Sequence, residues 1–428
     1  MNLKYGSTSF QLDLPPEHLA GVISPPLITT DQSPEEIITS ALDDCMPVIS
    51  TFKAGEKVVI ITSDVTRYTA SELYLPLLLE RLRKQGISDG DVEILIALGI
   101  HRRQTADEHG KILGPLYGRI RVTDHDCDDP AALVTAGTTS GGVEVSINRL
   151  AVEADHLILT GAIGFHYFAG FSGGRKSVLP GIAGRKSCMD SHFKVLNPEN
   201  GSGRNARAVT GNLDGNPVHQ MMMEGCALVA PSLILNTVLS PEKRVIAAFA
   251  GGWREAHESG CHYYRERFTF SLPEKGDLVV ASCGGYPRDI NLIQAHKSME
   301  FAAQSLKDGG VMILLAECRD GFGHDSFFSW FRHTQLEDFE AALRQKYEIN
   351  GQTAYSLLQK AQRFRIILVS QFPAQQVTAM GMLPAQSLEE SMTLATGLLP
   401  AGWKGYVMPE AGSVLPVLTP LPEGVPVI

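Results

Sequence analysis

A glycine-rich segment, Gly161–His192, carries the densest set of residues that could do chemistry. It reads GAIGFHYFAGFSGGRKSVLPGIAGRKSCMDSH and holds seven glycines between positions 161 and 184. Glycine weakens both helices and strands, so this density favours a backbone that approaches a ligand closely and offers N–H groups to an anion. The segment matches a nucleoside-triphosphate loop poorly, because Arg175 stands where that motif has the glycine before its lysine. The alternative is that the glycines only permit sharp turns, but the basic and imidazole side chains among them favour a binding site.

Three of the thirteen histidines differ from the rest by their position. His101 follows an expected strand that ends in ALGI, His166 lies between two aromatic residues of the glycine-rich segment, and His192 comes sixteen residues after Lys176. Imidazole is both a neutral metal ligand and the side chain best suited to proton transfer near pH 7. A single histidine is most often a hydrogen-bonded structural residue. We interpret His125, which lies between two acids in TDHD, as part of a polar loop.

Polar residues at two other places could bind a small acid. Asp64 and Arg67 lie in SDVTR after the first strong strand, and a guanidinium can hold a carboxylate through two hydrogen bonds. Their residue types are equally consistent with a helix capped by Ser63 or Asp64 and a surface ion pair at Arg67. Gln294 and Lys297 share a face of an expected helix, although a helix lysine is normally solvated.

Short apolar strands that alternate with helices would position these residues. Strands are expected over 57–61, 92–97 and 156–160, and a helix over 71–84. Polar or glycine-rich residues follow each of these strands. In open α/β sheets the carboxyl ends of the strands form the edge where ligands bind, so the candidate residues are expected there.

A second series of the same kind begins near residue 273. Its expected elements are strands over 277–282, 311–316 and 365–370 and helices over 289–306 and 353–363. This order predicts an α/β fold of two domains, with parallel or mixed sheets flanked by helices and an active site in the cleft between them. We expect a cofactor-binding domain over 1–268 and a C-terminal domain over 269–389. The tail 390–428 could also complete the first domain.

Composition excludes several classes of protein. The 428 residues carry a formal net charge of −10 without a run of Lys and Arg, which argues against nucleic acid or an anionic membrane as a partner. No apolar run approaches the roughly 18 residues that a membrane span needs, and Met1–Tyr5 does not begin a secretory signal. Seven scattered cysteines without a C-x-x-C pair argue against a disulfide framework or a structural zinc site. A cytoplasmic location is therefore expected.

Together these segments resemble the nickel-dependent lactate racemase family over most of the chain. The matching segments, in the family's order and spacing, are SDVTR at 63–67, GIHR at 99–102, HYFAGFSGGRKS at 166–177, PGIAG at 180–184, His192 and GGYPxDxNLxQAxK at 284–297. The long central segment is highly specific. The resemblance implies a nickel-pincer nucleotide as cofactor, pyridinium-3,5-bisthiocarboxylic acid mononucleotide nickel, and cofactor-assembly enzymes as partners.

The resemblance also implies a role for each candidate residue. Lys176 corresponds to the lysine that is attached covalently to the cofactor, and His192 to the protein's ligand to nickel. His101 and His166 correspond to the paired acid/base histidines. The remaining implied positions are Arg67, Gln294 and Lys297 around the substrate, and Asp64 with the turn Ser172, Gly173 and Gly174 at the cofactor and its phosphate.

The implied reaction is the racemisation or epimerisation of a small-molecule 2-hydroxy acid. Its C2 hydrogen lies on a barely acidic carbon, so removal as hydride, while a base takes the hydroxyl proton, is easier than deprotonation. Return of hydride to the other face of the planar keto acid inverts the centre. Lactate racemases of the family have a tryptophan where this chain reads QTAY at 352–355, so we expect a 2-hydroxy acid other than lactate, or a broader pocket.

Two other functions stay open on the sequence. A nicotinamide-dependent oxidoreductase would also have strands followed by glycine-rich turns, but no G-x-G-x-x-G here opens a helix with an acidic residue about 20 positions later. A non-catalytic cofactor-binding protein could share the same fold, because fold alone does not establish activity. The presence of Lys176, His192 and both acid/base histidines argues against this last function.

Overall fold

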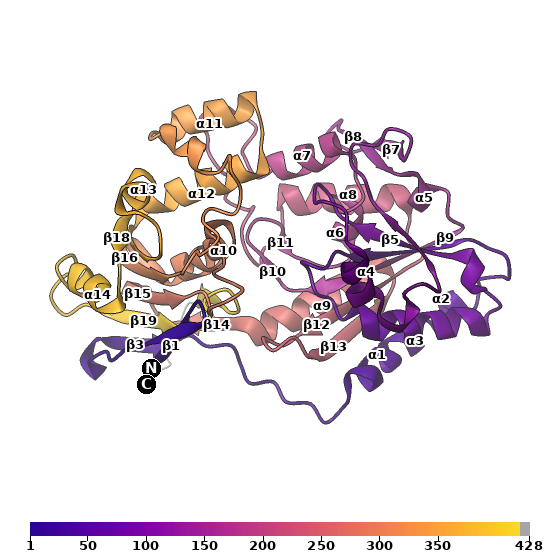
Figure 1. Ribbon diagram of the computed structural model, residues 1–428, viewed down its shortest axis with the longest axis horizontal. Coiled ribbons are helices and arrows are strands. Elements are labelled where there is room, and N and C mark those ends of the chain that lie inside the picture. The colour runs from indigo at the N-terminus through magenta and orange to yellow at the C-terminus, as the bar shows by residue number, and fades with distance from the viewer. Residues whose placement is uncertain (420–428) are drawn as a thin grey trace. The chain divides into compact units, whose positions relative to one another are not determined.

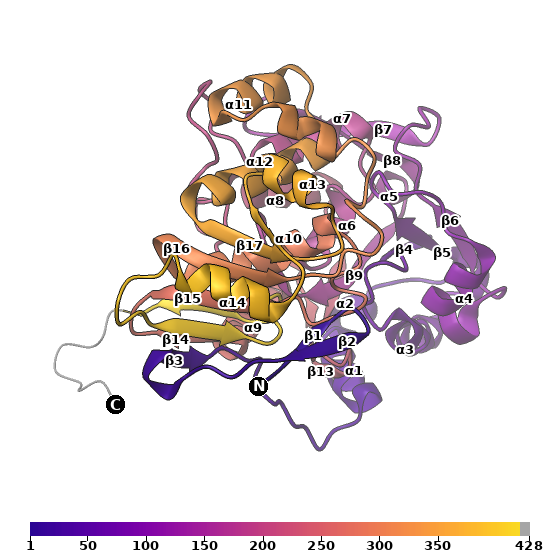
Figure 2. The ribbon, with the colours of Figure 1, turned by 60° about the vertical axis from the view of Figure 1, so that its left-hand side comes forward.

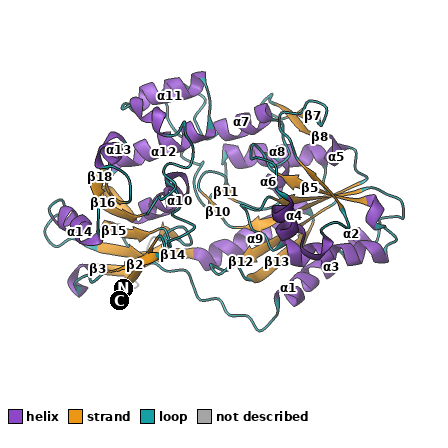
Figure 3. Cartoon of the chain, in the orientation of Figure 1, coloured by secondary structure: helices purple, strands orange, loops and turns teal. Residues whose placement is uncertain are grey.

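A computed structural model describes residues 1–419 of the chain. Helices and strands alternate along it, as an α/β fold requires (Figure 3). The chain divides into two compact units, which confirms the expected fold class. The first unit comprises Leu27–Leu196 and Arg204–Arg267, and the second unit comprises Met1–Pro26, Asn197–Gly203 and the chain from Phe268 onward. The predicted cleft between two domains stays a prediction.

A six-stranded sheet forms the centre of the first unit (Figure 1). In spatial order its strands are β13 (Val245–Gly251), β12 (Leu233–Leu239), β9 (His156–Ile163), β4 (Val58–Ser63), β5 (Val92–Ala97) and β6 (Arg121–Asp124). All neighbours pair in parallel except β13, which is antiparallel to β12. The carboxyl ends of the five parallel strands therefore meet at one edge of the sheet.

Helices cover both faces of this sheet, so each inner parallel strand buries its side chains on both sides. Val58 and Ile60 of β4 belong to one apolar core, and Val59 and Ile61 to the other. The first core also contains side chains of α1 (Pro34–Asp43), α2 (Met46–Ile49), α3 (Ser71–Lys84) and α4 (Ala106–Leu113). The second contains side chains of α5 (Arg149–Val152), α6 (Arg175–Val178), α8 (Pro217–Val229) and α9 (Trp253–Phe268).

Local sequence explains where several of these elements begin and end. Capping boxes start α1 at Ser33 and α4 at Thr105. In each, the N-cap hydroxyl accepts the backbone N–H of a glutamate three residues later, and the glutamate carboxylate accepts the backbone N–H of the N-cap residue. The observed bounds of α3 and β5 agree with the expected 71–84 and 92–97. Among residues 1–419, no helix is both long and apolar enough to cross a membrane.

The second unit is built on a six-stranded sheet whose neighbours all pair in parallel. In spatial order its strands are β18 (Leu383–Ala385), β17 (Arg365–Val369), β16 (Leu306–Leu315), β15 (Gly276–Ser282), β19 (Gly405–Met408) and β3 (Leu19–Val22). The helices around it are α10 (Leu292–Ala302), α11 (Leu336–Gln345), α12 (Ile349–Arg363), α13 (Ala374–Ala379) and α14 (Leu388–Thr396). α14 covers the face that includes Val280, Ile313 and Ile367.

The division of the chain differs from the expected domains at both ends. β3 pairs with β19, which in turn pairs with β15, so β3 from the N-terminal segment lies at an edge of the second unit's sheet (Figure 2). β20 (Leu415–Leu418) pairs with β14 (Thr269–Leu272) in the same unit. Residues 1–26 therefore do not belong with the expected 1–268 domain, and residues 390–419 do not complete it. Residues 420–428 lie outside the described part of the chain.

Candidate active site

The candidate residues of the first unit lie at the edge formed by the carboxyl ends of its parallel strands. Asp64 follows β4 directly, and His101 comes four residues after β5. A short hairpin of β10 (Phe165–His166) and β11 (Gly170–Phe171) follows β9 and carries His166. Lys176 is on α6, and His192 is on α7 (Arg185–Phe193). Sheet topology thus brings segments distant in sequence to one edge, as expected for an open α/β sheet.

Asp64 and His101 form a hydrogen-bonded pair. Oδ2 of Asp64 lies 2.7 Å from Nδ1 of His101 and 3.0 Å from Nη1 of Arg67, and the Asp64 side chain is fully buried. Burial alone would raise the pKa of Asp64, but hydrogen bonds from His101 and Thr66 and the positive charge of Arg67 outweigh it and lower the pKa to about 2. An ionised carboxylate can only accept, so Nδ1 of His101 carries the proton and Nε2 keeps its lone pair. Nη2 of Arg67 lies 3.5 Å from Nε2, so a substrate hydroxyl that gives its proton to Nε2 would replace this long contact.

This pair shows that Asp64 and Ser63 do not cap a helix. α3 begins at Ser71, with Ala70 as its N-cap residue. Oδ1 of Asp64 instead accepts the backbone N–H of Thr66, at 2.9 Å, in a turn that follows the strand. Arg67 does form an ion pair, as the alternative expected, but its partner is this buried carboxylate and 58% of its own side chain is exposed. Its guanidinium also faces the His101 ring, with Nη1 3.2 Å from Nδ1 and Nη2 3.5 Å from Nε2.

The ring of Phe168 lies among three of the candidate residues. Its centroid is 4.6 Å from that of His166 and 5.3 Å from that of His192, and both contacts are edge-to-face. The Nζ atom of Lys176 lies 5.8 Å from the same centroid. Nδ1 of His166 also accepts the backbone N–H of Ala169 at 3.3 Å. The structure therefore brings His166, Lys176 and His192 together around one aromatic ring.

His192 is buried and neutral at physiological pH. Burial and the charge of Lys176 lower its pKa to about 4, against the opposing effect of the Cys188 carbonyl, and Arg67 adds to the lowering. Nδ1 lies 2.8 Å from that carbonyl oxygen and donates to it, so the lone pair is on Nε2. A neutral imidazole whose other nitrogen is held by a carbonyl is the usual state of a metal-ligating histidine. Lys176 and Arg67 both lie close enough to lower the pKa of His192. Because Arg67 also contacts Asp64, this places the Asp64–His101 pair near the residues around Phe168.

The glycine-rich turn packs against its own fold more closely than the sequence indicated. A Cβ at Gly161 would lie 2.7 Å from the backbone N of Gly174, and Gly173 has a φ of +114°. The N–H of Gly174 donates to Oδ1 of Asn236 at 2.7 Å, and the N–H of Ser172 donates to the Gly164 carbonyl at 2.8 Å. Close packing and backbone conformation therefore require glycine at positions 161 and 173, whether or not a ligand binds here. A phosphate at Ser172–Gly174 would replace these contacts or use other groups.

Gln294 and Lys297 lie on α10 of the second unit. Nζ of Lys297 donates to Oε1 of Gln294 at 2.7 Å, and the N–H of Gln294 donates to the N-capping side chain of Asn291 at 3.0 Å. This contact confirms that the two residues share a helix face, and both side chains are exposed. Because they belong to the second unit, their grouping with His101 and His166 in one site stays a prediction.

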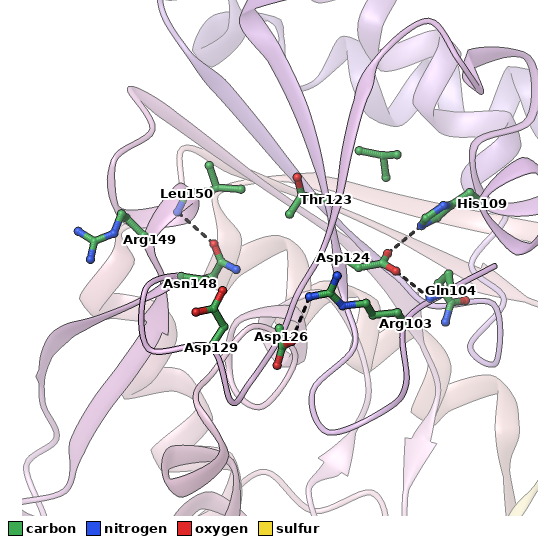
Figure 4. A pocket seen from close by; sticks show the side chains of 12 residues that line it. Arg103, Gln104, His109, Thr123, Asp124, Asp126, Asp129, Asn148, Arg149 and Leu150 are labelled. Carbon is green, nitrogen blue, oxygen red and sulfur yellow. Dashed lines mark hydrogen bonds and ion pairs between the residues drawn. The ribbon is translucent and has the colours of Figure 1, made fainter. Parts of the chain in front are cut away.

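One pocket of about 620 Å³ opens beside β6, but it contains none of the predicted site residues (Figure 4). Four of its ionisable side chains form two pairs: Arg103 with Asp126 at 3.1 Å and His109 with Asp124 at 2.8 Å. His125, expected in a polar loop, is instead buried, and its Nε2 donates to the Ala183 carbonyl at 3.0 Å. This region is therefore explained by structural pairing.

Comparison with known proteins decides the family. The lactate racemase N-terminal domain model matches residues 5–203, and the lactate racemase C-terminal domain model matches residues 272–415. A lactate racemase of Thermoanaerobacterium thermosaccharolyticum is 34% identical over 427 residues, which cover 97% of this chain and 98% of the relative. The chain belongs to the lactate racemase family. A lactate racemase of Lactiplantibacillus plantarum is 35% identical over 338 residues, 77% of each chain.

Solved structures agree with this family. The lactate racemase apoprotein from T. thermosaccharolyticum superposes with a TM-score of 0.88 at 34% identity, covering 97% of this chain and 99% of that one. A protein from Thermotoga maritima has a TM-score of 0.65 at 19% identity, covering 91% of this chain and 100% of that one, and so shares the fold. The resemblance to lactate racemases predicted from sequence is therefore confirmed.

The sequence does not indicate several residues that surround the candidate site. Phe168 lies inside the matched segment HYFAGFSGGRKS, so its aromatic ring beside His166 was a usable signal. Asn236 and His257 give no such signal, because they reach the turn from β12 and α9. His257 Nε2 donates to the Ser172 carbonyl at 3.0 Å. Arg175 departs from the nucleoside-triphosphate motif and is one of the basic residues among the glycines, but the sequence does not predict that it is fully buried.

Proposed function

We propose that the protein is a racemase or epimerase of a small 2-hydroxy acid. Its membership of the lactate racemase family supports an isomerase activity. The observation that carries the proposal is the Asp64–His101 pair, 2.7 Å long, which leaves an oriented lone pair at His101 Nε2. A racemase needs such a base at the hydroxyl group of its substrate. Lactate is the first substrate to test, because both curated relatives are named lactate racemases.

The donor groups fit a tethered nickel-pincer nucleotide, which we propose as the cofactor. His192 offers one buried, neutral nitrogen next to the positive charge of Lys176. Within residues 1–419 no group of three or more His, Cys, Asp or Glu side chains could hold a metal ion. A nickel ion at His192 would therefore need further donors from an organic ligand, and soft sulfur donors with an imidazole suit nickel. When bound, this cofactor would accept hydride from C2 and return it.

The chain's own residues would bind the substrate and move its proton. Nε2 of His101 would take the hydroxyl proton of one enantiomer, and the resulting imidazolium would be stabilised by the buried charge of Asp64. His166, whose Nδ1 accepts the Ala169 N–H and whose Nε2 therefore carries a proton, would give that proton to the re-formed hydroxyl, and the two histidines would exchange roles for the other enantiomer. The exposed N–H groups of Arg67 would hold the carboxylate, with Gln294 and Lys297 as further proposed substrate contacts. Lys176 would anchor the cofactor covalently.

The segment QTAY bears on the identity of the substrate. Gln352 and Tyr355 are buried on α12, with exposed fractions of 0% and 2%. Lactate racemases have a tryptophan in this part of the family's sequence, so we propose a 2-hydroxy acid other than lactate, or a broader pocket. A panel of enantiopure 2-hydroxy acids and sugar acids, followed by loss of optical purity, tests this. Lactate clearly preferred over every bulkier acid would contradict it.

Attachment of the cofactor can be tested with a matched pair of lysines. The tetrapeptide GRKS occurs at 174–177 and again at 184–187. Lys186 of the second copy is exposed and pairs with Asp190 at 2.7 Å. Protein co-produced with the cofactor-assembly enzymes should show an adduct with nickel and sulfur by intact mass, and Lys176→Ala should lack it. Lys186→Ala should keep it. An adduct in Lys176→Ala would overturn the assignment.

The reaction class is tested on loaded protein with substrate deuterated at C2. Return of hydride predicts that racemised product keeps the label on carbon, whereas a carbanion route predicts exchange with water. His101→Ala should abolish racemisation while the Lys176 adduct remains. Retained activity would exclude His101 as the base. Net oxidation that consumes free nicotinamide would instead favour the oxidoreductase alternative.

A further inference from the structure

Arg175 is a fully buried cation whose hydrogen bonds all go to neutral groups. Nε donates to Nδ1 of His219 at 3.1 Å. Nη1 lies 3.2 Å from the Phe171 carbonyl oxygen and 3.1 Å from that of Ser172. Nη2 lies 3.3 Å from the Ala169 carbonyl oxygen and 3.2 Å from that of Phe171. Within residues 1–419 no carboxylate forms an ion pair with it. Burying such a charge is unfavourable, so its position calls for an explanation.

The second copy of GRKS shows that the local sequence does not place Arg175 inside. Arg185 occupies the same position in that copy, where it is half exposed and Nε donates to Oδ1 of Asp128 at 2.7 Å. Both arginines follow a glycine and begin a helix. The burial of Arg175 is therefore a property of its surroundings, in which its hydrogen-bond acceptors are backbone carbonyls of one short segment and one histidine of α8.

The segment that Arg175 holds is the hairpin that carries His166. β10 and β11 have only two residues each, with His166 paired to Gly170 and Phe165 to Phe171. So short a hairpin has little stability of its own. Arg175 binds the carbonyls of Ala169 and Phe171 in its second half. The N–H of Ala169 in turn donates to Nδ1 of His166, so a two-bond path runs from the guanidinium to the imidazole.

A second buried side chain fixes the tip of the same hairpin. Nδ2 of Asn216 donates to the Phe168 carbonyl at 2.9 Å, while its Oδ1 accepts the N–H of Val218 and so caps α8. His219, the partner of Arg175 Nε, lies on the first turn of α8. The hairpin is thus tied to the start of α8 by Asn216, and to both α8 and α6 by Arg175.

We propose that Arg175 is a positioning residue that sets the place of His166 relative to Lys176, its neighbour on α6. This inference rests on the proposed function, in which Lys176 carries the cofactor and His166 moves a proton. Proton transfer requires reacting atoms to be aligned, and a misplacement of about 1 Å can lower the rate about 10²-fold. Binding of the substrate at Arg67 and attachment at Lys176 do not require this alignment.

The first test replaces the guanidinium and follows His166 without the cofactor. Arg175→Lys keeps the charge and removes the planar fork of donors. In cofactor-free protein, the ¹H–¹⁵N signals of the His166 ring, assigned with His166→Gln, should shift or broaden in Arg175→Lys, while those of His101 stay in place. Arg185→Lys, the same change in the second GRKS copy, should move neither. Unchanged His166 signals in folded Arg175→Lys would overturn the proposal.

The loaded enzyme gives a second, independent readout. Arg175→Lys should retain the Lys176 adduct and lower kcat about 10²-fold, with KM changed by less than about threefold. An equal loss in adduct formation and kcat would indicate a merely structural role and overturn the proposal. If wild-type protein racemises no 2-hydroxy acid, the proposed function fails, and the His166 signals still decide the role of Arg175.

If the Arg175 variants do not fold, variants of His219 test whether the Arg175–His219 contact positions His166. His219→Leu removes the acceptor for Arg175 Nε, whereas His219→Asn places an amide oxygen where Nδ1 accepts. His219→Leu should displace the His166 signals and lower kcat about tenfold, and His219→Asn should restore both. Identical behaviour of the two variants would show that the contact does not position His166.

Discussion

The buried carboxylate of Asp64 touches the imidazole of His101, with Oδ2 2.7 Å from Nδ1. The family resemblance implies that Asp64 lines the cofactor site and that His101 transfers a proton, but it does not connect the two residues. The contact connects them, because an ionised, buried carboxylate both fixes the tautomer of the imidazole and stabilises its protonated form. Arg67 shares the same carboxylate oxygen at 3.0 Å. The group expected to bind the substrate and the group expected to take its proton are thus held by one side chain.

Asp64→Asn is expected to lower kcat by about 10²-fold or more, because the amide no longer fixes the protonated tautomer at Nδ1. The racemisation rate of loaded protein measures this, and intact mass checks that the Lys176 adduct is retained. Asp128→Asn is the matched control, since Asp128 forms a surface ion pair with Arg185 and 58% of its side chain is exposed. The kcat of Asp128→Asn should stay within about twofold of the wild-type value. An Asp64→Asn enzyme with wild-type kcat would remove Asp64 from the mechanism.

Gly161→Ala is expected to destabilise the first unit by about 1–3 kcal/mol, because its Cβ would lie 2.7 Å from the Gly174 backbone. Gly164→Ala provides the control in the same segment, since its Cβ would meet its nearest atom, Ser172 Oγ, at an ordinary 3.5 Å. Thermal unfolding of both variants measures the difference. Equal stability of the two would show that close packing of β9 against α6 is not why position 161 is glycine.

The free energy of unfolding is expected to rise with pH between about 4 and 6.5. Burial and the charge of Arg175 lower the pKa of His219 to about 3, and the same two causes lower that of His257 well below its ordinary value. Between the folded and unfolded pKa values the unfolded chain binds more protons, so stability is complete above about pH 6.5 and is lost as the pH falls. Each histidine contributes a slope of up to about 1.4 kcal/mol per pH unit.

Urea unfolding at pH values from 5 to 7.5 measures this slope, since carboxylates such as Asp64 titrate below that range. The buried His125 and His192 act in the same direction, because their pKa values are also lowered. His219→Gln should therefore reduce the slope without abolishing it. His262→Gln is the control, because the His262 side chain is 71% exposed. A slope unaffected by the loss of His219 would contradict the expected burial of a neutral imidazole.

Lys360→Met is expected to destabilise the second unit by about 3–5 kcal/mol, because it removes the ammonium group from the buried Glu300 carboxylate and leaves the His296 imidazole, 3.3 Å away, beside it. The Lys360 and Glu300 side chains are 2.6 Å apart and only 8% and 6% exposed, and they join α12 to α10. Lys346→Met, which removes an 81%-exposed partner of Glu348, should cost less than about 1 kcal/mol. Hydrogen exchange of α10 and α12 would locate the effect. The double variant Glu300→Gln/Lys360→Met should recover part of the loss, and no recovery would exclude a paired role.

The amino-acid sequence alone predicted the alternation of strands and helices and the family. α3 and β5 begin and end where expected. Their type and their bounds depend on apolar periodicity and flanking residues, which lie within a few positions of each element. The segments HYFAGFSGGRKS and GIHR identified the family, which the relatives confirm. The expected place of Asp64, His101 and His166 beyond the carboxyl ends of parallel strands also agrees with the sheet. The roles of these residues stay predictions.

Long-range pairing decided the rest. Residues 1–26 and 390–419 join the second unit because β3 and β19 pair across almost the whole length of the chain, and no local pattern identifies such partners. Asp64 is a partner of His101 rather than a helix cap for the same reason: β4 and β5 are neighbours in the sheet. The two GRKS segments are the clearest case. Their residues are identical, yet one arginine is buried among carbonyls and the other pairs at the surface, because the environment of a side chain depends on the elements packed against it.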